Sequence, residues 1–111
     1  MAVVNIYKFY GVDNVASTDA QTMFGSGLPA ANETDLVKSI KVTSAGTPSV
    51  TVINNSITTI KSAALTANVT TELLTQPLVV EGGKTLTVAS SSTDSFDVAI
   101  SYLNIKKEIT S

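Results

Sequence analysis

Hydrophobic and polar residues alternate along several short stretches of this 111-residue chain, and this alternation limits the fold most strongly. In SFDVAISYL the residues Phe96, Val98, Ile100 and Tyr102 are separated by serine, aspartate and alanine. Successive side chains of an extended strand point to opposite sides, so these four residues share one face. The segment is therefore predicted to be a strand with one buried face.

The same period of two recurs in four further segments. Their predicted inward residues are Leu86 and Val88 in KTLTVAS, Ile40 and Val42 in LVKSIKVTS, Val50 and Val52 in SVTVIN, and Val69, Thr71 and Leu73 in NVTTELL. VVNIYKFYGV is also predicted to be a strand, and DAQTMFG a weaker one. A helix is considered only for residues 62–74, where the β-branched run at 69–71 argues against more than a short helical turn.

Turn-forming residues separate these strands at 44–48, 54–56, 81–83 and 90–94. Their spacing of roughly 8 to 14 residues is typical of an antiparallel sandwich or barrel. We expect one all-β domain, a single antiparallel β-sandwich of immunoglobulin-like or jelly-roll type with about seven to eight strands. Residues 1–33 are predicted to form an N-terminal strand or arm and a loop, 34–105 the sandwich body, and 106–111 a short C-terminal tail.

The residue types that carry most enzyme chemistry are missing. The chain has no cysteine and no histidine, which removes thiol nucleophiles, the commonest general base and nearly every zinc or copper site. A serine nucleophile would need a lysine base, but Lys38 and Ser39, like Lys61 and Ser62, are adjacent and so point to opposite faces of a strand. We therefore predict a protein that is not an enzyme, with no catalytic residue, no cofactor and no metal.

Gly83-Lys84-Thr85 matches the end of a phosphate-binding loop, but its context favours a turn. That loop needs a glycine where Leu78 stands, and it opens a helix, whereas TLTVAS alternates as a strand. Gly82-Gly83 supplies two residues that accept positive φ, so LVVEGGKTLTV is interpreted as a hairpin. Asp94 is interpreted as a turn residue and Asp97 as solvent-facing; a calcium ion held by such aspartates is the less favoured alternative, because the ligand spacing of a calcium loop is missing.

Charge and hydropathy patterning limit the partners. The net charge is −2, all seven basic residues are lysines, and without arginine the bidentate recognition of phosphates or guanine is lost. MAVVNIYKFYG is apolar over only a few residues and has no basic leader, so it is predicted to be neither a signal peptide nor a membrane span. We expect no nucleic-acid partner and no membrane.

Four aromatic or aliphatic residues near the N-terminus are the candidate partner interface. Tyr7 and Phe9 fall on one face of the predicted first strand, and Ile6 and Tyr10 fall on the other. One interpretation is a strand buried on both sides within its own sandwich. The other is a strand that packs on its own domain and on a neighbouring protein, because tyrosine and phenylalanine are favoured in interface cores.

The body of the chain resembles small virion structural proteins of tailed bacteriophages. The resemblance covers about residues 34 to 105 and rests on DLVKSIKVTSAGTPSVTVINNS, LTANVTTELLTQPLVVEGGKTLTVAS and SFDVAISYLNIKK. Within these, the segment from Leu78 to Val88 and the closing run from Val98 to Leu103 carry the pattern. The resemblance implies a β-sandwich that coats or joins parts of a particle, and it transfers no catalytic residue.

From this resemblance we expect a capsid decoration (cement) protein that binds the outer surface of the major capsid protein and bridges its subunits. It would be located in the virion after assembly in the host cytoplasm, and it could form a homo-oligomer such as a trimer. A neck, tail or fibre-attachment protein, which binds another virion protein, is the first alternative. A carbohydrate- or receptor-binding module is the second, although the chain has no tryptophan.

Overall fold

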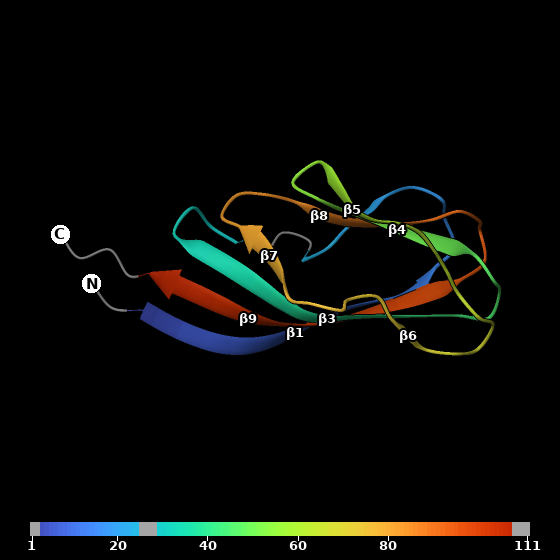
Figure 1. Cartoon of the computed structure of the whole chain (residues 1–111), viewed down its shortest axis with the longest axis horizontal. Coiled ribbons are helices and arrows are strands. Elements are labelled where there is room, and N and C mark those ends of the chain that lie inside the picture. The colour runs from blue at the N-terminus through green and yellow to red at the C-terminus, as the bar shows by residue number, and fades with distance from the viewer. Residues whose placement is uncertain (1–2, 25–28, 108–111) are drawn as a thin grey trace.

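The computed structural model describes residues 3–24 and 29–107, and this part of the chain contains nine strands and no helix. The predicted all-β sandwich is confirmed, since the strands form two antiparallel sheets that pack face to face (Figure 1). The strands are β1 (Val3–Val15), β2 (Gln21–Thr22), β3 (Glu33–Ser44), β4 (Ser49–Asn54), β5 (Ile57–Ala64), β6 (Thr71–Glu72), β7 (Leu78–Glu81), β8 (Leu86–Ser90) and β9 (Phe96–Lys107). No helix in the described residues is long and apolar enough to cross a membrane.

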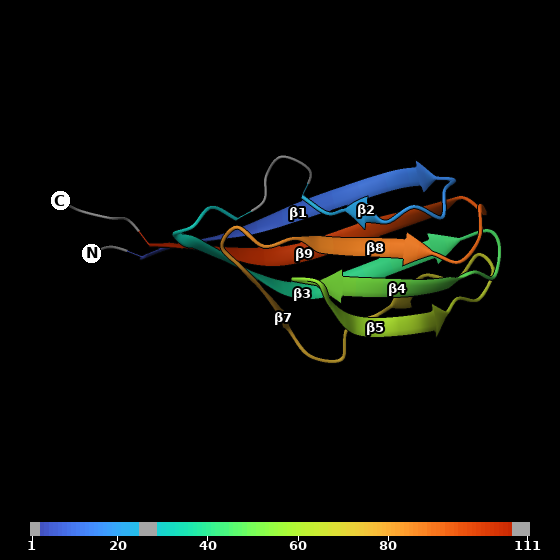
Figure 2. The ribbon, with the colours of Figure 1, turned by 90° about the horizontal axis from the view of Figure 1, so that it is seen from above.

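A five-stranded sheet of long strands forms one layer. Its order is β1-β9-β3-β6. β7 also pairs with β3, at residues Thr34–Val37, whereas β6 pairs further along β3, at Lys41 and Val42. The four-stranded sheet, in the order β2-β8-β4-β5, forms the other layer. The molecule measures 52 × 22 × 21 Å, and the five-stranded sheet extends beyond the four-stranded sheet toward the chain termini (Figures 1 and 2).

The core lies between the two sheets and is built from the residues that alternation placed inward. All four predicted inward residues of SFDVAISYL are buried, as are those of KTLTVAS, LVKSIKVTS and SVTVIN. Phe96, Ile40 and Ile100 are among the largest fully buried side chains. Burial of apolar surface stabilises a domain by about 25 cal/mol per Å², so these strands supply most of the hydrophobic stabilisation of the fold.

Two strands at the sheet margins differ from the prediction. NVTTELL was expected to be a strand with Val69 inward, but β6 covers only Thr71–Glu72, and Val69 lies before it with 49% of its surface exposed. β5 was not predicted, because it is an edge strand with mostly exposed residues and no apolar alternation. Nine strands therefore replace the expected seven to eight, and residues 62–74 contain no helical turn.

The glycine pair is a turn, as predicted, but it does not close a hairpin. The amide of Lys84 donates to the carbonyl of Glu81 at 3.0 Å, and β8 follows as a strand. β7 pairs with β3 and β8 with β4, so the turn carries the chain from one sheet to the other. Of the two glycines in this turn, only Gly83 has a positive φ, of 76°. A Cβ on Gly82 would lie 2.4 Å from the carbonyl oxygen of Ala30.

The first and last strands are neighbours along almost their whole length. β1 pairs with β9 from Val3↔Lys107 to Val12↔Val98 without a register shift. β1 is thus an edge strand of the five-stranded sheet, and β9 continues past residue 105 into the predicted tail. Residues 108–111 of that tail lie outside the described residues.

Candidate protein-interaction surface

The five-stranded sheet has an inner face, toward the four-stranded sheet, and an outer face, away from it (Figure 1). Residues directly opposite each other on paired strands point to the same side. Lys8 and Tyr10 lie opposite the buried Tyr102 and Ile100, so they point inward. The alternate residues of β1 therefore belong to the outer face.

Tyr7 and Phe9 are the most exposed large apolar side chains on the outer face. Tyr7 is 77% exposed and Phe9 is 68% exposed, and they lie opposite Leu103 and Ser101 of β9. The interpretation in which this strand is buried on both sides is therefore wrong. A pair of exposed rings on a sheet face is the kind of apolar feature that marks contact sites rather than ordinary solvated surface.

Ile6 and Tyr10 point to the inner side, as the alternation predicted. Tyr10 is half-buried and packs against the core, and its ring lies 5.7 Å from that of Phe24. Ile6 is 48% exposed, because it lies opposite Asn104 in the part of the sheet that extends toward the termini. The four candidate residues thus divide between a core contact and an outer surface.

An apolar row crosses four neighbouring strands on the outer face. Tyr7 of β1 lies opposite Leu103 of β9, Leu103 lies opposite Leu36 of β3, and Leu36 lies opposite Val79 of β7. Leu36 and Leu103 are half-buried and Val79 is 48% exposed. This apolar row is a continuous band in which every cross-strand neighbour is hydrophobic, and it adjoins Phe9.

The residues of the apolar row beyond Tyr7 were missed by sequence reasoning. Each belongs to a pair of adjacent apolar residues: Leu36-Val37, Val79-Val80 and Tyr102-Leu103. Because neighbours in a strand point to opposite faces, such a pair makes both faces apolar at one level. These three pairs could have indicated from the sequence that the outer face is partly apolar. Their alignment into one band depends on the strand register, which the sequence does not give.

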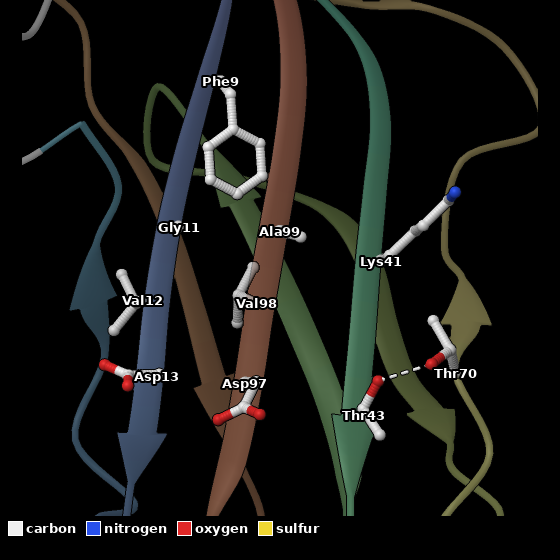
Figure 3. Close-up of a pocket in the computed structure, with 10 residues that line it drawn as sticks. All are labelled: Phe9, Gly11, Val12, Asp13, Lys41, Thr43, Thr70, Asp97, Val98 and Ala99. Atoms are coloured by element: carbon white, nitrogen blue, oxygen red, sulfur yellow. Dashed lines mark hydrogen bonds between the residues drawn. The ribbon is translucent and has the colours of Figure 1, made fainter.

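An open hollow lies beside Phe9 on the same face, with a volume of about 490 Å³ (Figure 3). Its floor contains Gly11 and Ala99, which lie opposite each other on β1 and β9. A Cβ on Gly11 would lie 3.0 Å from the ring of Phe9, so the glycine leaves room for that ring. The small floor residues and the ring form a depression that suits an inserted apolar side chain.

Polar groups border this hollow on the sides away from Phe9. Lys41 and Thr43 line it from β3, and the hydroxyls of Thr43 and Thr70 are 2.7 Å apart (Figure 3). Asp97 also lines it, and its Oδ1 accepts a hydrogen bond from the amide of Asn14 at 2.8 Å. An apolar centre with a polar border is the usual arrangement of a protein-contact patch.

A buried polar pair lies on the inner face beneath the apolar row. Nδ2 of Asn104 donates to Oδ1 of Asp35 at 2.6 Å, and both residues are buried. Burial raises the pKa of the Asp35 carboxyl above its ordinary value, although the hydrogen bond from Asn104 acts in the opposite direction. Glu33 adds to the increase in pKa and Lys8 opposes it. The pair fixes the register of β3 against β9, since only one alignment lets these side chains satisfy each other.

The aspartates considered for calcium take part in local hydrogen bonds. Oδ2 of Asp94 accepts from the hydroxyl of Ser92 at 3.0 Å in the turn before β9, and Asp97 is exposed on that strand, as predicted. Within residues 3–24 and 29–107, no group of three or more acidic, histidine or cysteine side chains is placed to hold a metal ion.

Neither protein-family models nor curated protein sequences give a match for this chain.

Proposed function

We propose that the chain is a non-enzymatic structural protein of a phage virion, a capsid decoration protein that binds the outer surface of the major capsid protein. The sequence resemblance supplies the type of particle. The apolar row and the exposed rings of Tyr7 and Phe9 supply the attachment surface, and they are the observation that carries the proposal. Because contacts repeat over a capsid lattice, each copy needs only modest affinity.

The arrangement of the domain suits this role. The outer face is presented by the long strands, whereas the four-stranded sheet covers only part of the other side (Figure 1). This face can lie along the seam between two capsid subunits and contact both. Its stabilising effect on the shell would come from bridging, which resists separation of the subunits under internal pressure.

A binding assay tests the attachment surface. Particles that lack the protein are mixed with purified wild type, with Leu103→Ser in the apolar row, or with Ile53→Ser as the control. Both positions are half-buried, and Ile53 pairs with Thr87 on the outward side of the four-stranded sheet. Leu103→Ser should weaken binding at least tenfold, about 1.4 kcal/mol. Equal binding by all three proteins would contradict the proposed surface.

Particle stability and copy number test the place in the virion. Particles without the protein should lose infectivity faster on heating or osmotic shock than particles to which it has been restored. Hundreds of copies per particle favour the capsid shell. A dozen or fewer favour the alternative of a neck, tail or fibre-attachment protein, which would use the same surface against a different virion protein.

A carbohydrate-binding module is the second candidate, and the paired exposed rings of Tyr7 and Phe9 favour it. Sugars stack on aromatic rings, and the hydroxyls and carboxylates around the hollow offer hydrogen bonds. A glycan array separates the two candidates. Binding to a defined glycan that Tyr7→Ser abolishes would support this candidate over the decoration role.

A further inference from the structure

We propose that two copies of the chain pair antiparallel along β1, joining their five-stranded sheets into one continuous sheet. This inference goes beyond the proposed attachment to a particle, because it uses the edge of the sheet instead of its outer face. An edge strand presents a row of unpaired backbone N–H and C=O groups, which a second strand can satisfy. A second copy supplies such a strand with the same length and the same twist.

β1 differs from the other sheet edges in the described residues. The four-stranded sheet ends at β2, with two residues, and at β5, whose pairing with β4 is interrupted by two register shifts. The far edge of the five-stranded sheet is divided between β6 and β7. β1 is regular from Val3 to Val12 and contains no proline. Bulges, short strands and prolines are among the usual protections against edge pairing, and Val3–Val12 has none of them; its one charged residue is Lys8, and the register shift of β1 lies beyond Val12.

Symmetry limits the possible registers. Two copies related by a two-fold axis perpendicular to the sheet keep their outer faces on the same side. Outer-face residues of one copy must then lie opposite outer-face residues of the other. One residue therefore lies directly opposite its own copy, and the axis passes midway between the two. An axis at Phe9 pairs residues 6–12 of one copy with residues 12–6 of the other, all within the regular part of β1.

The register centred on Phe9 matches the side chains. The two Phe9 rings face each other, and Tyr7 lies opposite Gly11 of the second copy, where it can contact the Phe9 ring that lies against that glycine. On the inner side Lys8 lies opposite Tyr10 of the second copy, a favourable pairing of an ammonium group with an aromatic ring.

The neighbouring registers are poorer. An axis at Lys8 places the two ammonium groups opposite each other, and like charges directly opposite destabilise a sheet. An axis at Tyr7 places each Phe9 ring opposite Asn5 of the other copy, so the Phe9 rings lose their aromatic partner. Only the Phe9 register pairs the two Phe9 rings with each other and places Lys8 opposite Tyr10, and it brings the apolar rows of both copies onto one surface.

Cysteine substitutions test this register, because the chain has no cysteine of its own. Directly opposite Cα atoms lie roughly 4.5 to 5.5 Å apart, which suits the distance of about 4.4 to 6.8 Å that a disulfide spans. Phe9→Cys should therefore form a disulfide-linked dimer under mild oxidation. In Tyr7→Cys the two sulfurs belong to residues about 14 Å apart along the strands, so this control should cross-link at least ten times more slowly.

Sedimentation of the wild-type chain provides the second measurement. A concentration-dependent monomer–dimer equilibrium, shifted at least tenfold toward monomer in Phe9→Glu, supports the pairing, since that change places two carboxylates on the axis. Circular dichroism checks that each variant keeps its β-sheet signal. The inference would be overturned by a wild-type chain that stays monomeric at about 200 micromolar, by a trimer, or by faster cross-linking of Tyr7→Cys than of Phe9→Cys. Loss of particle binding alone, with the dimer intact, would count only against the proposed function.

Discussion

Removal of the Asn104 amide tests whether the buried polar pair holds the extended end of the five-stranded sheet. Asn104→Ala leaves the buried Asp35 carboxyl without its 2.6 Å hydrogen bond. A hydrogen bond to a charged group contributes about 1.5 to 3 kcal/mol, and a charge left unpaired in a buried site adds its own desolvation cost. At a pH above the folded-state pKa of Asp35, we expect the free energy of unfolding, measured by urea denaturation, to fall by about 2 to 4 kcal/mol.

The pH dependence follows from the raised pKa of Asp35. The folded protein binds the proton more tightly than the unfolded chain, whose carboxyl has the ordinary pKa of 3.8. The stabilisation is therefore fully present below pH 3.8 and is lost as pH rises through the folded-state pKa. The cost of Asn104→Ala should be smallest at pH 3, where Asp35 is protonated, and should increase as pH rises through the folded-state pKa and the carboxyl ionises.

Asp35→Asn is the matched control, since its amide oxygen still accepts from Asn104 but carries no charge. Its stability relative to wild type should increase between pH 3 and pH 7, and this difference cancels the titration of all other carboxyls. In the Asp35→Asn background, Asn104→Ala should cost about 1 kcal/mol, as for a neutral hydrogen bond. A wild-type minus Asp35→Asn difference that stays flat from pH 3 to pH 7, or an Asn104→Ala cost below about 0.5 kcal/mol, would refute the reasoning.

Three further substitutions probe the sandwich. Phe96→Ala removes a fully buried ring and should cost about 3 to 5 kcal/mol in urea denaturation; a cost below about 1 kcal/mol would contradict the described core. Gly82→Ala brings a Cβ within 2.4 Å of the Ala30 carbonyl and should lower the thermal midpoint more than Ala89→Gly, a comparison that deletes a half-buried methyl group and adds the backbone entropy cost of a glycine within β8; the reverse order would be inconsistent with the close approach. Glu72→Ala removes the carboxylate that accepts from the amide of Ile40 at 2.8 Å and should cost about 1 to 2 kcal/mol, with faster hydrogen exchange at Ile40; unchanged exchange there would argue against this contact.

Alternation predicted the inward faces of β3, β4, β8 and β9 correctly because these strands pack directly against one core. Ile40, Val52, Val88 and Ile100 are fully buried, and each is flanked by residues that point away from the core. In such strands the pattern of hydrophobic residues and the pattern of burial have the same physical cause. The turn at Gly82-Gly83 was found for a similar reason, since Gly83 adopts a positive φ.

Pairing between strands was not predictable in the same way. β7 and β8 are joined by a short turn, which favours a hairpin, but β7 pairs with β3, with Val80 opposite Asp35 and Leu78 opposite Val37. β5 and β6 lie at sheet margins, where backbone hydrogen bonds hold strands that have little apolar alternation. The apolar row depends on the register of four strands at once, so only its first member, Tyr7, could be identified from the sequence.

An electron cryomicroscopy map of the intact particle tests most directly whether the outer face of the five-stranded sheet is a protein-contact surface in a virion. We predict many copies of the sandwich on the capsid shell, with Tyr7 and the apolar row in contact with the major capsid protein. Particles without density for this domain, or copies whose outer face points to solvent, would contradict the claim.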